Sequence, residues 1–258
     1  MGLPALDLAG KTAVVIGGTT GIGRALSRGL AEAGADVVPT GRREELVAEA
    51  AAAVEALGKR TVRVATDVAS RASLEATLEA ATRALGHVDI LVNCAGRTAR
   101  QSTLVQAEED WQAILDTNLT GTLRACQVFA PPMIQRGWGR IINVASLATF
   151  VAFLEVAAYA ASKSAVASLT KSLAIELGPK GVNVNGIAPG FFPTDLNRSI
   201  LEGTGRGREV LMRTPLGRFG RVEELAGAAV FLASEAASFV NGEIIVVDGG
   251  FLASGSNQ

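Results

Sequence analysis

The stretch that decides the fold reads Thr12-Ala-Val-Val-Ile-Gly-Gly-Thr-Thr-Gly-Ile-Gly23. Its first five residues form a short apolar run that favours a β-strand, and a helix is expected after it, over about 24–33. The glycines between them let the backbone turn tightly and approach a pyrophosphate, which would rest on the helix N-terminus. Strand, glycine turn and helix in this order predict a dinucleotide-binding unit. The spacing Gly17-x-x-x-Gly21-x-Gly23 differs from the more common Gly-x-Gly-x-x-Gly, and glycine-rich turns also occur for steric reasons alone.

The rest of the chain repeats this alternation of strand and helix. Strands are expected at 11–17, 36–40, 61–66, 88–92, 140–145, 182–187 and 243–248, and helices at 24–33, 44–57, 71–85, 108–135, 157–177 and 222–234. Regular alternation predicts an α/β fold, a doubly wound Rossmann-type parallel sheet of seven strands with helices on both faces. Ser70 is expected to cap the helix over 71–85, and the helix over 108–135 is expected to divide near Pro131-Pro132.

Length and composition favour a single domain over 1–258, because no linker, charge run or repeat marks a boundary. The net charge of −1 argues against nucleic acid and anionic membrane as partners, and no apolar run is long enough to span a bilayer. The two cysteines, Cys94 and Cys126, favour reduced thiols in a cytoplasmic protein. The single His87, without a Cys/His cluster, argues against a metal site.

A second informative stretch runs from Ser146 to Lys163. Its later part is rich in alanine and predicts a helix, on which Tyr159 and Lys163, four residues apart, share one face. A nearby positive charge lowers the pKa of a tyrosine, and such a phenol can act as general acid or base on an oxygen. An ordinary helix pair is the alternative for an isolated Tyr-x-x-x-Lys. Ser146 favours the catalytic role, because it follows a predicted strand at the end where α/β sheets bind ligands.

Taken together, these residues resemble the short-chain dehydrogenase/reductase family. The resemblance covers about residues 8–250 and rests, in family order, on Gly17-x-x-x-Gly21-Ile-Gly23, Asp67, Asn93-Cys-Ala-Gly96, Asn118, Ser146, Tyr159-x-x-x-Lys163 and Pro189-Gly190. Two positions depart from the family pattern: Ile16 stands where threonine is usual, and Cys94 where a second asparagine is usual. The segment from Asn185 through Gly249-Gly-Phe251 further resembles gluconate 5-dehydrogenases and related sugar-acid members.

This resemblance implies an oxidoreductase that transfers a hydride between a nicotinamide dinucleotide and a secondary alcohol or ketone. It implies that Tyr159 is the proton donor or base, and that Lys163 lowers the pKa of Tyr159 and binds the nicotinamide ribose. Ser146 would orient the substrate carbonyl, and Asn118 would help to hold a water that links Lys163 to solvent. The cofactor-binding residues that the resemblance and the motifs imply are Gly17, Thr19, Thr20, Gly21, Ile22, Gly23, Arg42, Arg43, Asp67, Val68, Asn93, Ala95, Gly96, Tyr159, Lys163, Pro189, Gly190, Phe192 and Thr194.

The end of the second predicted strand favours NADP(H) over NAD(H). In this fold an acidic residue at that position usually accepts hydrogen bonds from the adenosine ribose, and here Gly41 takes its place. Arg42 follows directly, and a guanidinium can bind a 2′-phosphate through paired, charge-assisted hydrogen bonds. Arg43 adds positive charge. Because Thr20 is not the basic residue that many NADP-dependent relatives carry there, use of both cofactors stays open.

The substrate is less well marked. The segment at about 190–214 is expected to form a lid, and Arg97, Arg100 and Arg198 are candidates to meet a substrate carboxylate. The apolar helices predict a homotetramer, built as a dimer of dimers. Two alternatives stay open, namely a non-catalytic dinucleotide-binding sensor or scaffold of the same fold, and a carbonyl reductase for another ketone class.

Overall fold

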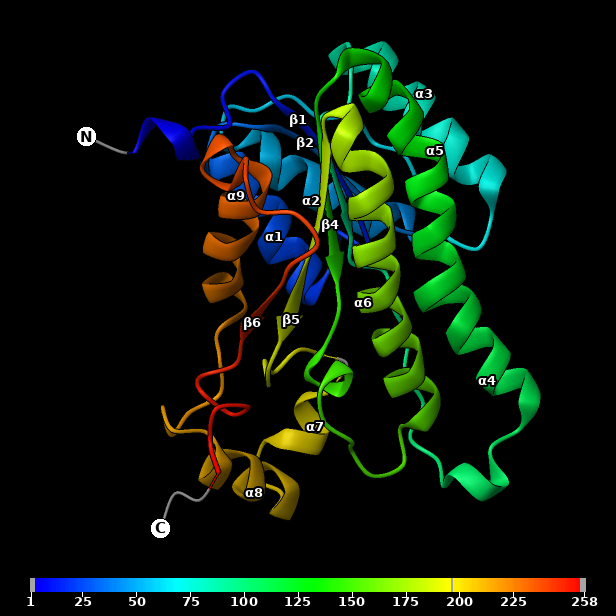
Figure 1. The fold of residues 1–258 in the computed structure, drawn as a ribbon, viewed down its shortest axis with the longest axis vertical. Helices are drawn as coiled ribbons and strands as arrows, with labels where there is room; N and C mark the ends of the chain where they lie inside the picture. The colour runs from blue at the N-terminus through cyan, green and yellow to red at the C-terminus, as the bar shows by residue number, and fades with distance from the viewer. Residues whose placement is uncertain (1–2, 196, 256–258) are drawn as a thin grey trace.

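The computed structural model describes residues 3–195 and 197–255, and it shows one parallel sheet in the order β2-β1-β3-β4-β5-β6 (Figure 1). The strands are β1 (Thr12–Ile16), β2 (Asp36–Thr40), β3 (Ile90–Asn93), β4 (Gly139–Val144), β5 (Val182–Pro189) and β6 (Ile244–Val247). The strand order reverses between β1 and β3, so a ligand crevice is expected outside their carboxyl ends. The Rossmann-type class and the parallel sheet are as predicted.

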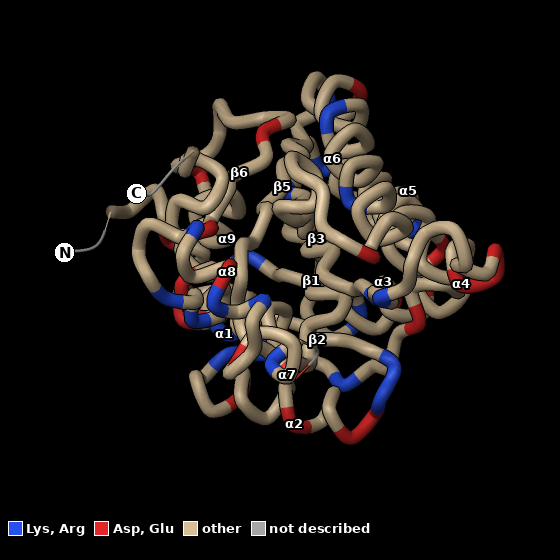
Figure 2. Tube along the Cα trace, turned by 90° about the horizontal axis from the view of Figure 1, so that it is seen from below, with Lys and Arg blue, Asp and Glu red and all other residues tan. Residues whose placement is uncertain are grey.

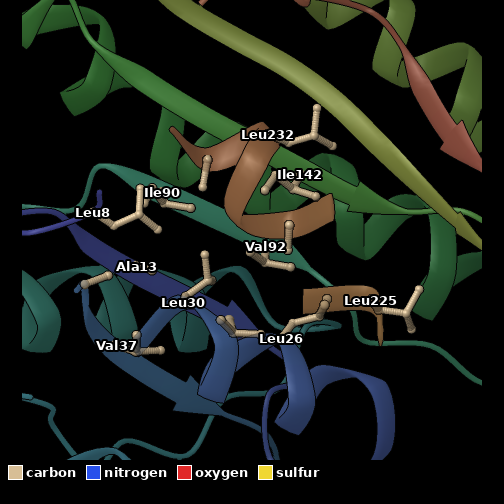
Figure 3. Close-up of a cluster of buried hydrophobic side chains, with 14 of the residues drawn as sticks. Leu8, Ala13, Leu26, Leu30, Val37, Ile90, Val92, Ile142, Leu225 and Leu232 are labelled. Carbon is tan, nitrogen blue, oxygen red and sulfur yellow. The ribbon is translucent and has the colours of Figure 1, made fainter. Parts of the chain in front are cut away.

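Helices cover both faces of the sheet. They are α1 (Gly21–Glu32), α2 (Glu44–Glu55), α3 (Arg71–Leu85), α4 (Glu108–Leu115), α5 (Gly121–Arg136), α6 (Ala157–Leu177), α7 (Arg198–Leu201), α8 (Gly205–Arg213) and α9 (Ala226–Ala233). Helices α1, α2 and α9 lie on one face, and α3, α5 and α6 on the other (Figure 1). On one face Val15 packs in a buried cluster with Leu30 and Leu232, the last two drawn in Figure 3, while Val14 packs on the other face. Strand β1 is buried on both faces, which explains its unbroken apolar run.

The segment 61–66 does not form the predicted strand, so the count of seven is wrong and the described residues hold six strands. This segment lies beside the outer edge of β2, where the Val37 N–H donates to the Arg60 carbonyl oxygen at 3.1 Å. Successive N–H groups of a strand point to alternate edges, so the next donor on this outer edge belongs to Pro39. Proline has no N–H, so the hydrogen-bond ladder is interrupted there, and the segments next meet where the Thr66 N–H donates to the Gly41 carbonyl oxygen at 2.8 Å.

The sequence predicts that the long helical region divides near Pro131-Pro132, but the helix continues through both prolines. It is interrupted earlier by a π-helical turn, Asp116–Thr120, which leads from α4 into α5. Helix α5 then runs through both prolines, whose fixed φ is itself helical, and ends before Gly137, which has a φ of 68° that suits glycine. The π turn holds Asn118 fully buried, so the irregularity falls at a candidate site residue.

The predicted bounds of α3 and α6 agree with the structure, and the Ser70 hydroxyl accepts the Ser73 N–H at 3.3 Å as the expected cap. The predicted lid segment 190–214 carries the two short helices α7 and α8, which lie at the carboxyl edge of the sheet (Figure 1). In Figure 2, which looks at this edge, charged residues gather mainly on the surrounding helices. Among the described residues, no helix has the length and apolar character needed to cross a membrane.

Candidate active site

Lys163 and Tyr159 lie on the first two turns of α6, against the carboxyl end of β4. Lys163 is 5% exposed, and its Nζ donates a hydrogen bond to the Val144 carbonyl oxygen at 2.6 Å. The same Nζ lies 5.8 Å from the centroid of the Tyr159 ring. Burial disfavours the charged ammonium and lowers the pKa of Lys163 to about 8. The structure therefore brings the predicted pair together, with the amine in a position and protonation range that suit proton exchange near neutral pH.

Ser146 faces Tyr159 from the loop that follows β4. Its hydroxyl accepts the Ala148 N–H at 3.1 Å and makes a side-chain hydrogen bond with Tyr159. Burial raises the pKa of Tyr159, and the hydrogen bond with Ser146 opposes this rise. The sequence predicts a pKa below the usual value, caused by Lys163. In the structure the pKa of Tyr159 shifts in the opposite direction, because burial of the phenol outweighs the effect of its hydrogen bond with Ser146.

Asn118 joins the loop after β3 to the catalytic helix. It is fully buried, and its Oδ1 accepts the Arg97 N–H at 2.8 Å. Its Nδ2 donates to the Arg97 carbonyl oxygen and to the Ser162 hydroxyl, both at 3.0 Å. Ser162 in turn donates to the Tyr159 carbonyl oxygen at 2.7 Å. This chain of hydrogen bonds fixes the π turn, the loop and α6 relative to one another, and it accounts for the irregular turn at Asn118.

The glycine turn has the shape that a dinucleotide pyrophosphate requires. A Cβ on Gly23 would lie 1.9 Å from the Gly17 carbonyl oxygen, and one on Gly17 would lie 2.6 Å from Ala95 N, so both positions need glycine. Helix α1 begins at Gly21 with no side-chain cap from Thr20 and no acidic residue in its first turn. Its free N–H groups therefore form a suitable site for a phosphate.

The remaining predicted cofactor residues surround this turn. Thr194 lies over it, since a Cβ on Gly21 would come within 3.2 Å of its Cγ2. Gly96 lies beside the catalytic groups, since its Cβ would be 3.7 Å from Lys163 Nζ. Gly190 packs against Asp248 and allows β5 to end there, because a Cβ would lie 2.7 Å from that backbone. Others among them are buried in or near the site, namely Thr19, Val68, Asn93, Pro189 and Phe192.

Three predicted cofactor residues have informative surroundings. Arg42 and Arg43 are exposed at the end of β2, and neither has an ion-pair partner among the described residues. Asp67 accepts the Ala69 N–H at 3.0 Å and so shapes its own turn. The carboxylate of Asp67 thus already has a structural role in its own turn, whereas the guanidinium groups of Arg42 and Arg43 are available to bind a ligand.

Two of the three arginines that the sequence puts forward for a substrate carboxylate already bind carboxylates of the chain. Arg100 Nε contacts Glu155 at 2.6 Å, and Arg198 Nη1 contacts Glu202 at 2.8 Å. Among the described residues, Arg97 has no such partner. The sequence spacing indicates the Arg198–Glu202 pair, whose members are four residues apart, but not the partner of Arg100, which lies 55 positions away.

Sequence reasoning missed an aromatic cluster at the same edge. The ring centroids of Phe153 and Phe191 lie 5.6 Å apart, and that of Phe251 lies 6.2 and 5.2 Å from them. The three rings come from the loop after β4, the loop after β5 and the C-terminal segment. The spacing of the phenylalanines in the sequence does not predict this cluster, because contacts between three loops depend on the folded sheet.

Comparison with known proteins agrees with this geometry. The family model described as enoyl-(acyl carrier protein) reductase matches residues 17–252. The chain is 41% identical to a 2-dehydro-3-deoxy-D-gluconate 5-dehydrogenase of Bacillus subtilis (strain 168) over 250 residues, which are 96% of this chain and 97% of the relative. It is 39% identical to a gluconate 5-dehydrogenase of Gluconobacter oxydans (strain 621H) over 248 residues, again 96% and 97% of the two chains.

A solved structure is similarly close. The crystal structure of a gluconate 5-dehydrogenase from Burkholderia cenocepacia J2315 in complex with NADP and tartrate has a TM-score of 0.93 and 40% identity, and the match covers 97% of this chain and 98% of that one. The chain belongs to the short-chain dehydrogenase/reductase family. More narrowly, it is an NAD(P)-dependent oxidoreductase that transfers a hydride to or from a CH–OH carbon.

Proposed function

We propose that the site at the carboxyl edge reduces a ketone, or oxidises the corresponding secondary alcohol, with Tyr159 as the proton donor or acceptor. The observation that supports this most directly is the assembly of Tyr159, Ser146 and buried Lys163 beside the glycine turn. When bound, the nicotinamide ring supplies the hydride to the carbonyl carbon, or accepts it in the reverse direction.

Each side chain has a distinct task in this proposal. Ser146 donates a hydrogen bond to the carbonyl oxygen and so stabilises the charge that develops there. Tyr159 gives its proton to that oxygen during reduction and takes it back during oxidation. Lys163, with a pKa of about 8, returns a proton to the phenol and hydrogen-bonds the ribose. Asn118 positions α6 through Ser162 and holds the water that connects Lys163 to solvent.

We propose NADP(H) as the preferred cofactor, with NAD(H) also accepted. Arg42 supports this, because its guanidinium is exposed and has no ion-pair partner among the described residues. Gly41 supports it too, since the position leaves no carboxylate to repel a 2′-phosphate. The related structure from Burkholderia cenocepacia contains NADP. The cofactor-binding residues named from the sequence are proposed as the walls of this site.

Three further features belong to the same proposal. The chain forms a single domain, and the segment 190–214, with α7 and α8, acts as a lid over the substrate. The protein works in the cytoplasm as a homotetramer, a dimer of dimers. Exposed apolar side chains on the surface support association, among them Ile175 on α6, which is 78% exposed. The free thiols of Cys94 and Cys126, whose pKa values burial raises to about 11 and about 12, support a reducing compartment.

The names of the relatives make sugar acids one candidate substrate class. The aromatic cluster at the site favours a second class, ketones of a less polar kind. Both classes undergo the same proton and hydride transfer, so the chemistry can be tested before the substrate is known. Oxidation of NADPH is followed with a panel of ketones that includes sugar acids, steroids, acyl thioesters and aryl ketones.

The decisive variant is Tyr159→Phe, which removes one hydroxyl from the only tyrosine of the chain. Loss of the general acid is expected to lower kcat by a factor of about 10² to 10⁴ while dinucleotide affinity stays near that of the wild type. Lys163→Met is also expected to lose activity, and Lys171→Met, on the exposed side of the same helix, serves as its matched control. Near-normal kcat in Tyr159→Phe would refute the mechanism. Clear dinucleotide binding without turnover of any ketone would favour a sensor.

A further inference from the structure

The aromatic cluster Phe153–Phe191–Phe251 lies next to the proposed reaction centre. In the sheet, Val144 of β4 is in register with Ile187 of β5, so Ser146 is level with Pro189. Phe191 follows Pro189 by two residues. Phe153 lies on the loop that connects Ser146 to the catalytic helix, and its ring meets that of Phe191 edge to face at 81°. The two rings therefore belong to loops that leave the same edge of the sheet as Ser146.

The third ring supports the first two from behind. Phe251 is 3% exposed, and its centroid lies 5.2 Å from Phe191 and 6.2 Å from Phe153, which are both partly exposed. The Gly249-Gly250 turn before it packs against the end of the lid segment, since a Cβ on Gly249 would lie 2.9 Å from Thr214. Three separate segments thus build a fixed apolar wall with two rings left partly open at its front. Such a wall stabilises an apolar substituent of a ligand, and offers no hydrogen bonds to hydroxyl groups.

One ion pair close to this wall is already satisfied within the chain. Glu155 is the one charged residue between Ser146 and Tyr159, and it binds Arg100 at 2.6 Å. The backbone also holds this pair, because the Gln101 N–H donates to the Glu155 carbonyl oxygen at 2.8 Å. Glu155 itself has a φ of 65°, a conformation that non-glycine residues adopt at a cost of roughly 1 kcal/mol. A substrate carboxylate that bound Arg100 would have to displace Glu155 from it.

Two other cationic side chains, those of Arg97 and Arg213, belong to segments at this edge. Arg97 is exposed without an ion-pair partner among the described residues, and Arg213 lies over the ring of Phe251, with 4.8 Å between its Cζ and the ring centroid. Asn118 holds the backbone of Arg97, and within residues 3–195 and 197–255 no hydrogen bond or ion pair fixes its guanidinium. Either arginine would serve as a carboxylate anchor if the substrate were an acid.

We propose that the substrate is an uncharged ketone or secondary alcohol that carries an apolar, ring-sized substituent, which packs on Phe153 and Phe191. The proposal rests on the hydride-transfer function proposed above and narrows its substrate class. Glu155 contributes to specificity by occupying Arg100, which is then not available to a substrate carboxylate. The names of the sugar-acid relatives do not fix the substrate here, since the family model that matches the chain carries a different name, enoyl-(acyl carrier protein) reductase.

The test compares substrates that differ only in charge. Acetophenone and 4-acetylbenzoate share the reacting ketone and the ring, and 5-keto-D-gluconate represents the sugar acids. With NADPH, kcat/KM for acetophenone is expected to exceed that for each carboxylate by at least about tenfold. This factor is typical for the gain of one hydrophobic contact or the loss caused by one unpaired charge. Glu155→Gln frees Arg100 to bind a substrate carboxylate, so it is expected to narrow the gap in kcat/KM between acetophenone and 4-acetylbenzoate about tenfold.

Variants of the wall give a second readout. Phe153→Ala and Phe191→Ala are each expected to lower kcat/KM for acetophenone by about tenfold, mainly through KM, with unchanged dinucleotide affinity. Phe153→Leu and Phe191→Leu, which keep most of the apolar volume, serve if an alanine variant unfolds. Phe239→Ala is the matched control, because Phe239 is a fully exposed phenylalanine outside the cluster.

The outcomes separate this proposal from the function on which it rests. A wild-type preference for 5-keto-D-gluconate that Arg97→Gln or Arg213→Gln abolishes would overturn the uncharged substrate and leave the hydride-transfer function standing. Wall variants that change kcat/KM no more than Phe239→Ala would also overturn it. If the wild type reduces no ketone at all, the proposed function fails and the substrate class fails with it.

Discussion

The glycine at position 23 offers a sharp test of the cofactor site, through the substitution Gly23→Ala. The added Cβ would lie 1.9 Å from the Gly17 carbonyl oxygen, whereas real Cβ atoms essentially never approach closer than 3.0 Å. The difference, 3.0 minus 1.9, requires a shift of at least 1.1 Å. Both partners are backbone atoms of the same turn, so no flexible side chain can move away and the turn itself must open.

The cost follows from this displacement. Overpacking of this kind destabilises a protein by about 1–3 kcal/mol, and the upper part of that range is expected because the clash involves backbone. The open turn also moves the N–H groups of α1 away from the pyrophosphate. Dinucleotide affinity should therefore fall by roughly 10- to 100-fold, which corresponds to about 1.4–2.8 kcal/mol.

Urea unfolding followed by circular dichroism and calorimetric titration with NADPH would measure the two effects. Gly227→Ala is the matched control, since Gly227 is also a helical glycine and a Cβ there would meet nothing within 4 Å. The control should be unchanged or more stable by about 0.5–1 kcal/mol, because alanine favours helix. Wild-type affinity and stability in Gly23→Ala would refute the idea that this turn is shaped by close backbone approach.

Three further predictions concern the cofactor, the buried asparagine and pH. Arg42→Ala should lower kcat/KM for NADPH by about 10- to 100-fold and leave NADH little changed, because one charge-assisted contact to the 2′-phosphate is lost; an unchanged ratio of the two cofactors would disprove the assignment. Asn118→Ala should lower the free energy of unfolding by about 2–4 kcal/mol and reduce kcat, because it loses three buried hydrogen bonds. Asn183→Ala, which loses three hydrogen bonds to carbonyl oxygens, should lower stability without reducing kcat. The pKa of Lys163 in the folded protein, about 8, lies below its ordinary value of 10.5, so the unfolded chain binds more protons between these two pH values. The free energy of unfolding of the wild type should therefore rise from pH 8 to pH 10 relative to that of Lys163→Met. The rise, measured by urea unfolding, should be up to about 3 kcal/mol. A parallel pH dependence in the two proteins would contradict the lowered pKa.

Local signals in the sequence were sufficient where one segment determines its own structure. Helix α3 begins after the Ser70 cap and ends before Gly86, and both ends are read directly from residue types. Strand β2 was also located from its own apolar run. The segment 61–66 has strand-like composition as well, but its outcome depends on Pro39 of the neighbouring strand, which no local pattern reveals.

The same distinction holds for the site. The predicted group of Ser146, Tyr159 and Lys163 is brought together, since two members share a helix and the third ends a strand. Contacts between distant loops were not predictable from spacing, and the Arg100–Glu155 pair and the Phe251 contacts are examples. The direction of the Tyr159 pKa was also missed, because the extent of burial is a property of the whole fold.

Pro39 has a consequence beyond the strand count. An edge strand with a full row of free N–H groups is a template on which a foreign strand can pair, and such pairing leads to aggregation. Here the outer edge of β2 lacks a donor at Pro39, and one of its remaining donors, Val37, is occupied by Arg60. At the opposite edge, β6 has only four residues. The missing donor and the segment 61–66 beside it make this edge a poor template for a foreign strand, so Pro39→Val is expected to lower solubility.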